Sequence, residues 1–564
     1  MRDTDQADPT EARAARAYHA RCRYRFRLAC LGFALAFLVI GGRLTILGFT
    51  GTEEAGGGLY DISTTVHRPD ILDRNGRLLA TDIRGATLYA DPKRVIDIDE
   101  LAQQVASVLH DVNANKLRER LKAGGRFVRI KRELTPTQEA EVHELGQPGL
   151  AFIQEYRRFY PVGATASHVV GLVDVDNRGL AGIEKFLDDN PQLTMASPQT
   201  ESGEETVTLS LDIGVQHVLR EELHDAMTTF KSKAAAGIVM DLHSGEVIAL
   251  ASLPDFDPHH REQALDKDRL NRIGFGVYEM GSVFKVFTVA GVLDSGLASL
   301  NTRYDASAPI HYASFTISDF HGKGRPLTVP EVFIYSSNIG SAKMALQMGV
   351  DRHRAFLERL GLLEPVTTEL GPSAAPIIPK HWQKLNTMTI AFGHGLSVTP
   401  LQLATSTLPL VNGGIAVTPT FLPRSREEGI ASGHRVLKEQ TSATMLKLMR
   451  MNVERGTGKR ANAEGYRVGG KTGTAEKVVH GRYSSSALLT SFLSTFPTDD
   501  PQYVVLVMLD EPQRVAASLN HATAGLNAAP TVGKIVARIA PILGVAPKLD
   551  EPKRRFDAKV SATY

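Results

Sequence analysis

Cysteine is nearly absent from this sequence. The chain has 564 residues and only two cysteines, Cys22 and Cys30, both near its start. The rest of the chain therefore has no disulfide framework and no zinc site built on cysteines. It is suited to an oxidising compartment, because it contains no thiols that could mispair.

Net charge is also small. The 64 lysines and arginines nearly balance the 62 aspartates and glutamates, which leaves a formal charge of +2 at pH 7. A nucleic-acid-binding domain carries a basic excess, so we expect no nucleic-acid partner. Hydrophobic residues make up 43% of the sequence, which is enough for sizeable cores. The length predicts several domains.

Only one long hydrophobic run is present. Residues 28–49 are apolar apart from Arg43, and they are long enough to cross the roughly 30 Å core of a bilayer. Residues 12–27 contain six arginines and no acid, and Glu53 and Glu54 follow the run. This asymmetry predicts a cytoplasmic N-terminus, with the body of the protein outside. A cleaved signal peptide is the alternative, but the run is too long and has no clean cleavage site before Arg43.

Changes in composition predict where the chain divides. A stretch rich in Ser, Thr, Pro, Gly and Glu over residues 194–206 indicates a domain boundary. The polar and mixed-charge end of the chain indicates a disordered tail. We predict a cytoplasmic tail at 1–27, a transmembrane helix at 28–49, a mixed region at 50–204, a larger domain at 205–545 and a disordered tail at 546–564.

Local patterns predict individual elements. Residues 66–82 have the pattern of two strands joined by a turn at Asn-Gly, and residues 237–252 that of a β-hairpin. Residues 283–292 are apolar nearly all round, which indicates a buried helix. The continuous apolar run at 503–512 predicts a central strand. Apolar residues at helical spacing over 532–539 predict a C-terminal helix.

Three short motifs are candidates for chemistry, and the first is Ser282 with Lys285. Residues three apart share a helix face, so the hydroxyl and the amine can meet. Burial in an apolar helix lowers the pKa of a lysine, and a neutral amine can take the proton of serine. Gly281 indicates that the helix starts at the serine, where free N–H groups favour negative charge. Alone, however, S-x-x-K is a common accident.

The second motif is Ser336-Ser337-Asn338, which follows a helix-like stretch. From a loop, its hydroxyl and amide can both face a cleft. A helix cap or a turn is the alternative interpretation, because serine and asparagine favour both.

The third motif is Lys471-Thr472-Gly473-Thr474. Gly473 on a strand permits close approach by a ligand, and the flanking side chains can bind a carboxylate. Residues 465–472 also match the phosphate-binding pattern G-x-x-x-x-G-K-T. That alternative is disfavoured for two reasons. The sequence before residue 465 has no pattern of a buried strand, and the sequence after residue 472 has no helical pattern. The segment is also predicted to lie outside the cytoplasm.

Together, in this order, the motifs match the signature of penicillin-binding proteins and class A β-lactamases, with Ser337 where aspartate stands in S-D-N. The chain resembles the class B penicillin-binding proteins, specifically the FtsI-like division transpeptidases. RPDILDRNGRLLA at 68–80 resembles their first pedestal motif, and RRFYPVG and GLAGIEKFLDD resemble two later ones. YEMGSVFKVFT at 278–288 resembles Y-E-P-G-S-x-F-K-x-F-T, with Met280 in place of proline. Glu279 and Asn338 favour the division type over the elongation type.

The resemblance implies an α+β fold with an N-terminal transmembrane helix, an elongated pedestal of the penicillin-binding protein dimerisation type and a penicillin-recognising transpeptidase domain. That domain has a five-stranded antiparallel sheet between helical layers. The resemblance also implies D,D-transpeptidation of peptidoglycan stem peptides at the septum, inhibition by β-lactams and no metal or organic cofactor. The implied partners are a SEDS-family (FtsW-like) glycosyltransferase and other division proteins. The implied location is the inner membrane, with the catalytic domain in the periplasm.

The resemblance also assigns catalytic roles. Ser282 is expected to attack the penultimate D-Ala carbonyl, with Lys285 as the base. Ser336 and Lys471 are expected to pass the proton to the leaving amine, and Asn338 to hold the substrate amide.

Substrate binding is assigned to the third motif. Thr472 and Thr474, on either side of Gly473, are expected to bind the substrate carboxylate. The backbone N–H groups of Ser282 and Thr474 are expected to form the oxyanion hole.

Other functions stay open at this point. A β-lactamase shares the acylation chemistry, but an anchor and a pedestal argue against it. A non-catalytic division scaffold is a different class, and three intact motifs argue against it. If the pedestal binds a division partner, Arg68→Ala should block division and leave penicillin binding normal. Normal division in this variant would exclude the partner role. An elongation-type transpeptidase is the remaining alternative.

Overall fold

The computed structural model of the protein describes residues 31–41, 67–125, 127–192, 205–479 and 481–549. The chain forms two units, Met1–Ser63 and Thr64–Tyr564. In the first unit, residues 31–41 are helical. Among the described residues, no helix is both long and apolar enough to span a membrane. Much of the predicted span 28–49 lies outside the described residues.

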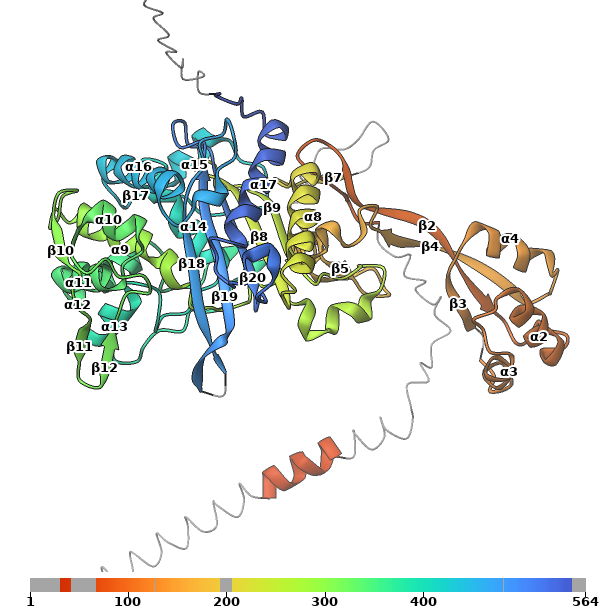
Figure 1. Cartoon of the computed structure of the whole chain (residues 1–564). Coiled ribbons are helices and arrows are strands. Elements are labelled where there is room, and N and C mark those ends of the chain that lie inside the picture. The colour runs from red at the N-terminus through yellow and green to blue at the C-terminus, as the bar shows by residue number, and fades with distance from the viewer. Residues whose placement is uncertain (1–30, 42–66, 126, 193–204, 480, 550–564) are drawn as a thin grey trace, which may run out of the picture. The chain divides into compact units, whose positions relative to one another are not determined.

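The second unit starts with a five-stranded sheet (Figure 1). Strand β1 (Asp70–Leu72) pairs antiparallel with β2 (Leu78–Ala90), which confirms the predicted strand–turn–strand. The long strand β2 pairs antiparallel with both β3 (Val128–Leu134) and β4 (Leu150–Phe159). Strand β7 (Thr206–Thr208) pairs parallel with β1, so this sheet continues past residue 204.

Helices cover the end of the β2–β4 ribbon that lies away from β1 (Figure 1). They are α2 (Ile98–Val108), α3 (Ala114–Lys122) and α4 (Pro136–Glu144). Their apolar residues join Leu88 and Val128 of the sheet in one buried cluster. We call residues 67–192 the pedestal region. It also contains β5 (Leu172–Val173), β6 (Gly179–Ala181), α5 (Ser167–Val170), α6 (Gly182–Asp189) and the 3-10 turn η1 (Gly163–Ala166).

A buried ion network holds the start of the pedestal region together. Glu184 is 0% exposed and binds two arginines, with Arg68 Nε at 2.9 Å and Arg158 Nε at 2.6 Å. Arg68 also pairs with Asp188, and Arg158 with Asp82. Arg68 is therefore a buried structural residue and not a surface for a partner.

Removing Glu184 tests this network. Breaking a buried ion pair leaves an uncompensated charge and costs about 3–5 kcal/mol. We expect Glu184→Ala to lower the free energy of unfolding of the pedestal region by that amount in denaturant titrations. The exposed Glu141→Ala serves as the control, and an equal small effect of both changes would contradict the interpretation.

The main body of the protein, residues 205–549, is built on a second sheet in which every neighbouring pair is antiparallel. Its order is β18 (Gly469–Val479), β19 (Arg482–Phe496), β20 (Tyr503–Asp510), β8 (Ala234–Asp241) and β9 (Val247–Leu253). The predicted hairpin corresponds to β8 and β9. The predicted central strand corresponds to β20, the third of the five.

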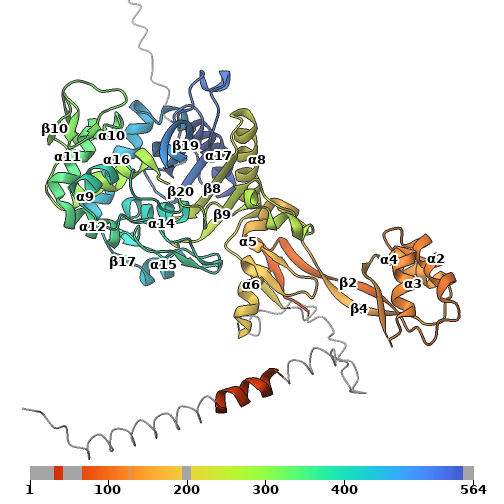
Figure 2. The ribbon, with the colours of Figure 1, turned by 90° about the horizontal axis from the view of Figure 1, so that it is seen from below.

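Alternating residues of β20 face two separate cores. Val505 and Val507 belong to a cluster with α8 (Ile213–Thr229) and α17 (Ala528–Ile542), which lie together on one face of the sheet (Figures 1 and 2). Leu506 belongs to the larger cluster on the opposite face. A strand that is apolar on both faces fits a sheet between two helical layers. The fold is thus α+β, with the predicted five-stranded antiparallel sheet.

The second helical layer includes the segments that carry the first two motifs, whereas the third motif lies on β18 at the edge of the sheet (Figure 2). Its helices are α9 (Lys285–Asp294), α10 (Val329–Ile334), α11 (Asn338–Met348), α12 (Val350–Arg359), α13 (Lys384–Ile390), α14 (Pro400–Val411), α15 (Arg426–Ser432) and α16 (Glu439–Arg455). The short strands pair as β10 (Arg303–Asp305) with β13 (Pro326–Thr328), β11 (Ile310–Tyr312) with β12 (Phe315–Ile317), β14 (Thr367–Thr368) with β15 (Gly371–Pro372), and β16 (Ile415–Ala416) with β17 (His434–Arg435).

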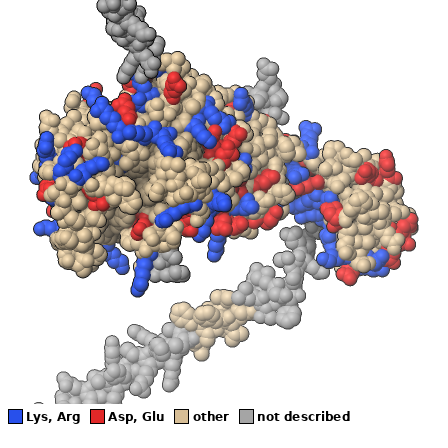
Figure 3. All heavy atoms as spheres, in the orientation of Figure 1, with Lys and Arg blue, Asp and Glu red and all other residues tan. Residues whose placement is uncertain are grey.

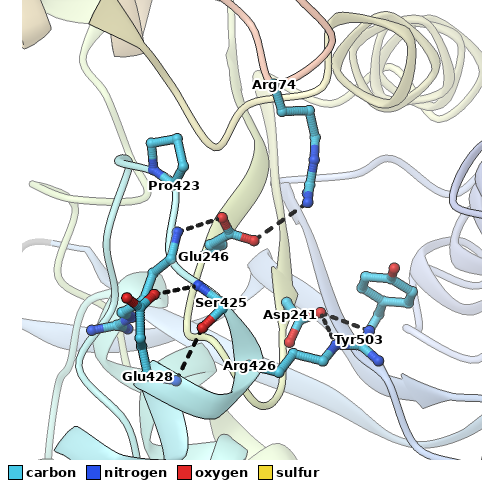
Figure 4. A pocket seen from close by; sticks show the side chains of 9 residues that line it. Arg74, Asp241, Glu246, Pro423, Ser425, Arg426, Glu428 and Tyr503 are labelled. Carbon is cyan, nitrogen blue, oxygen red and sulfur yellow. Dashed lines mark hydrogen bonds and ion pairs between the residues drawn. The ribbon is translucent and has the colours of Figure 1, made fainter. Parts of the chain in front are cut away.

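The turn after β1 contacts the main body. The Asp73 carboxylate accepts from the Ile213 N–H at 3.1 Å, and the Asn75 amide donates to Asp212 at 2.9 Å. Beside this joint is a cleft of about 570 Å³ (Figure 4). Its lining residues are Arg74, Asp241, Glu246, Pro423, Arg424, Ser425, Arg426, Glu428 and Tyr503.

Two ion pairs lie in this cleft. Arg74 points toward Glu246 at 3.4 Å, and Arg426 binds Asp241 at 2.8 Å (Figure 4). The cleft contains none of the predicted site residues. We therefore assign it to the joint between the pedestal region and the main body. On the face shown in Figure 3, acidic and basic side chains are similarly interspersed.

The predicted tail 546–564 lies largely outside the described residues. Its first residues contact the main body, since Lys548 binds Asp499 at 2.7 Å and donates its N–H to the Gly465 carbonyl.

His353 in α12 is a buried titratable group in the second helical layer. It is 0% exposed, packs its ring edge-on against Trp382, and neither ring nitrogen has a hydrogen-bond partner among the described residues. Burial lowers its pKa from 6.5 to about 4. The folded protein therefore holds a neutral imidazole that the unfolded chain protonates near pH 6.5.

This difference makes the fold sensitive to acid. The stability linked to His353 is intact above pH 6.5 and falls as the pH drops toward 4, by about 3 kcal/mol in all. We expect His353→Leu to lose correspondingly less stability than wild type between pH 7 and pH 4 in denaturant titrations. His434→Gln, at an exposed position, is the control, and identical pH profiles of His353→Leu and wild type would refute the expectation.

Candidate active site

The first motif lies where η4 (Gly281–Phe284) leads into α9. Ser282 is in this 3-10 turn and Lys285 is the first residue of α9, so the α-helix starts later than Gly281 predicts. Gly281 has φ +55°, and a Cβ there would lie 2.7 Å from the Thr474 carbonyl oxygen. Glycine at 281 therefore lets the nucleophile turn pack directly against β18.

The Lys285 amine is at the centre of the site. Its Nζ lies 2.9 Å from Ser282 Oγ and 3.0 Å from Ser336 Oγ. It also donates to the Ser336 carbonyl at 2.7 Å and to Asn338 Oδ1 at 2.7 Å. The structure thus brings the first and second motifs together at one amine.

The orientation of Asn338 decides what this amine can do. Asn338 Nδ2 donates to the Ser318 carbonyl at 3.0 Å, so Oδ1 faces Lys285. This oxygen and the Ser336 carbonyl can only accept, and together they take two N–H groups. The remaining tetrahedral position of a neutral Lys285 is then a lone pair, which is within reach of the Ser282 hydroxyl at 2.9 Å and of the Ser336 hydroxyl at 3.0 Å.

Electrostatics favour that neutral form. Lys285 is 0% exposed, and burial followed by repulsion from Lys471 holds its pKa well below 10.5. The nearby Asp319 acts in the opposite direction. A lysine with a lowered pKa is a general base at neutral pH.

Ser336 links the two lysines. Its Oγ lies 3.0 Å from Lys285 Nζ and accepts from Lys471 Nζ at 2.9 Å. Lys471 is also 0% exposed, and burial lowers its pKa to about 7. The third motif therefore meets the second at the Ser336 hydroxyl, on the side opposite the base.

The remaining residues of the third motif lie on β18. A Cβ at Gly473 would approach within 2.6 Å of the Met280 carbonyl oxygen and of the Val283 side chain. The Thr472 hydroxyl is 2.7 Å from that of Thr457, and the Thr474 hydroxyl accepts from the Ala524 N–H at 3.2 Å. The phosphate-loop interpretation is wrong here, because a strand and not a helix follows Lys471.

Several supporting residues were not predicted from the sequence. Asp319 accepts hydrogen bonds from the second motif, from Ser337 Oγ and from the Ile339 N–H. Glu279 accepts from the Gly395 N–H at 2.8 Å and from the Tyr483 hydroxyl at 3.0 Å. The sequence had no signal for these contacts, since each joins segments at least 18 residues apart.

Similarity to known proteins agrees with this geometry. Residues 235–537 match the penicillin binding protein transpeptidase domain, and residues 63–190 match the penicillin-binding protein dimerisation domain. The chain is 39% identical over 539 residues to the probable peptidoglycan D,D-transpeptidase FtsI of Caulobacter vibrioides, covering 94% of this chain and 90% of that protein. The chain belongs to the class B penicillin-binding proteins of the FtsI type.

Other relatives fit this assignment. The probable peptidoglycan D,D-transpeptidase PenA of Neisseria meningitidis is 31% identical over 504 residues, which cover 85% of each chain. The fold is shared with a peptidoglycan synthetase from Bifidobacterium adolescentis, at a TM-score of 0.67 and 21% identity, covering 86% of this chain and 97% of that one. The class B chain described here therefore has its family's fold as well as its motifs.

Glycines at the wall of the site give a matched pair of variants. Gly393 and Gly395 both have positive φ, +86° and +85°. A Cβ at Gly393 would lie 2.0 Å from the Gly281 carbonyl oxygen, whereas one at Gly395 meets nothing closer than 3.3 Å. Only the change at 393 would push on the turn that carries Ser282.

We expect Gly393→Ala to slow acylation of the protein by a fluorescent penicillin by about 100-fold, because small misplacements at a reacting centre have that effect. Gly395→Ala carries the same φ strain and should retain a rate near wild type. Equal losses in both variants would show that backbone strain, and not the contact with Gly281, is responsible.

Proposed function

We propose that this protein is a serine-type peptidoglycan D,D-transpeptidase that cross-links stem peptides during septal wall synthesis and is acylated by β-lactams. One observation carries the proposal. The buried Lys285 Nζ lies 2.9 Å from Ser282 Oγ, with its other positions taken by acceptors. This is the arrangement of a nucleophile with its base. Relatives named as D,D-transpeptidases support the substrate class.

Acylation starts at Ser282. Neutral Lys285 takes the hydroxyl proton as Ser282 Oγ attacks the carbonyl carbon of the penultimate D-Ala. The new C–O bond gives a tetrahedral intermediate with a negative oxygen. Backbone N–H groups of Ser282 and Thr474 stabilise this oxyanion, and each such donor is worth about 10²–10³ in rate.

Collapse of the intermediate expels the terminal D-Ala. The nitrogen of the breaking C–N bond must be protonated as it leaves. The Ser336 hydroxyl donates this proton, and Lys471 then returns a proton to Ser336 Oγ. The 2.9 Å contact between Lys471 Nζ and Ser336 Oγ supports this route. An amine from a second stem peptide then attacks the acyl-enzyme and restores Ser282.

Substrate is held on both sides of the nucleophile. Asn338 binds the backbone amide of the stem peptide. Thr472 and Thr474 bind the terminal carboxylate, close to the charge of Lys471. Gly473 allows this strand to approach the nucleophile turn, which supports a substrate position along the edge of β18.

We also propose the cellular arrangement. Residues 28–49 anchor the chain in the inner membrane, with residues 1–27 in the cytoplasm and the catalytic domain in the periplasm. The pedestal extends over 50–204 and the transpeptidase domain over 205–545. An FtsW-like glycosyltransferase and other division proteins are the proposed partners, together with stem peptides as substrate.

Labelling with fluorescent penicillin tests the acylation step. We expect a stable covalent adduct in the wild-type membrane fraction and none with Ser282→Ala, because the acylated oxygen is then missing. Lys285→Ala should slow labelling by about 10²–10⁴-fold, the usual contribution of a general base. Lys267→Ala, at an exposed position, is the control.

The remaining outcomes separate the alternatives. No adduct, together with rapid β-lactam turnover, would identify a β-lactamase. Neither adduct nor turnover would favour a non-catalytic scaffold, and either result would overturn the proposal. The unlabelled wild-type enzyme should also transfer the acyl group of a stem-peptide thioester to an amine acceptor with release of the thiol, and prior labelling should block this transfer.

A further inference from the structure

The second motif of this chain has no acid. Ser337 stands where the S-D-N form has aspartate, and it is only 2% exposed. Its hydroxyl oxygen accepts from the Gly340 N–H at 2.9 Å and so caps α11. The same hydroxyl donates to Asp319 Oδ2 at 2.7 Å. A carboxylate is therefore present at this motif, but it comes from a segment 18 residues earlier.

The second carboxylate oxygen extends this contact. Asp319 Oδ1 accepts from the Ile339 N–H at 3.0 Å. The neighbouring Ser318 carbonyl accepts from Asn338 Nδ2 at 3.0 Å. The two residues after β12 thus bind three successive residues, Ser337 and Asn338 of the motif and Ile339 after it, and Asn338 lies between the two that the carboxylate holds.

The motif requires such support because its first residue is strained. Ser336 has φ +58°, a left-handed conformation that is uncommon for residues other than glycine, asparagine and aspartate. Residues in such conformations persist only where the surrounding structure fixes them. The strain places Ser336 Oγ between the two lysines, at 3.0 Å and 2.9 Å.

From these contacts we propose that Asp319 is a positioning residue for the reaction, supplying from outside the motif the carboxylate that S-D-N carries within it. It fixes the loop so that the Ser336 hydroxyl and the Asn338 amide oxygen meet Lys285. This inference rests on the proposed transpeptidase function.

The carboxylate also acts through its charge. The charged or titratable groups acting on Lys285 are Lys471 on β18, Asp319, and His394 beside Gly393. Burial and Lys471 lower the pKa of Lys285, and Asp319 raises it. Without the carboxylate, Lys285 would become neutral at a lower pH.

An exchange of side chains tests the positioning. Asp319→Ser removes the carboxylate. Adding Ser337→Asp exchanges the two side chains, so the double variant has the same side-chain composition as wild type and again has a carboxylate at this contact. We expect the rate of Ser282 acylation by fluorescent penicillin to fall about 10- to 100-fold in Asp319→Ser and to recover at least tenfold in the exchanged protein. Asp305→Asn, an exposed acid that caps a turn in the same region, should leave the rate unchanged.

The pH dependence of the acylation rate gives a second test, because a purely structural role of Asp319 would not shift its midpoint. In Asp319→Asn, the rise of the acylation rate with pH should have its midpoint at a lower pH than in wild type. An Asp319→Ser rate within twofold of wild type, or an exchanged protein no faster than Asp319→Ser, would overturn the positioning role. An unshifted midpoint would overturn the electrostatic one. Absence of labelling in wild type would instead mean failure of the proposed transpeptidase function.

Discussion

Two lysine amines buried around one serine hydroxyl are the constraint on which the site depends. Lys285 and Lys471 are both 0% exposed and both lie within 3.0 Å of Ser336 Oγ. Charging both would bury two like charges, which is strongly unfavourable. This arrangement favours a neutral amine, and the two acceptors on Lys285 leave its lone pair within reach of the Ser282 hydroxyl. The chemistry follows from this shared burial more than from any single residue.

The rest of the main body excludes water from these two amines and fixes their positions relative to each other. The central sheet has apolar residues on both faces, and β18 at its edge brings Lys471 to the helical layer that holds Lys285. Close approach is possible because Gly281 and Gly473 have no Cβ where η4 and β18 meet. Asp319 then fixes the strained segment between the two lysines, so local strain is supported by a contact distant in sequence.

Prediction from sequence worked where a pattern has a local cause. Alternation, turn residues and apolar runs located β8, β9, β20 and α17, and the motif order identified the three segments that meet around Lys285 and Ser336. It failed where the cause is a contact between distant segments. The sequence did not show that Arg68 is buried against Glu184, and it had no signal for Asp319.

The sequence by itself determined which chemical groups this protein has and which elements carry them, because side-chain identity and periodicity are local properties. Only the tertiary structure decided which groups surround the Lys285 amine, the orientation of the Asn338 amide and the support of Ser336. These depend on burial and on neighbours at distances of about 3 Å, and the chain folds such neighbours together from positions up to 135 residues apart.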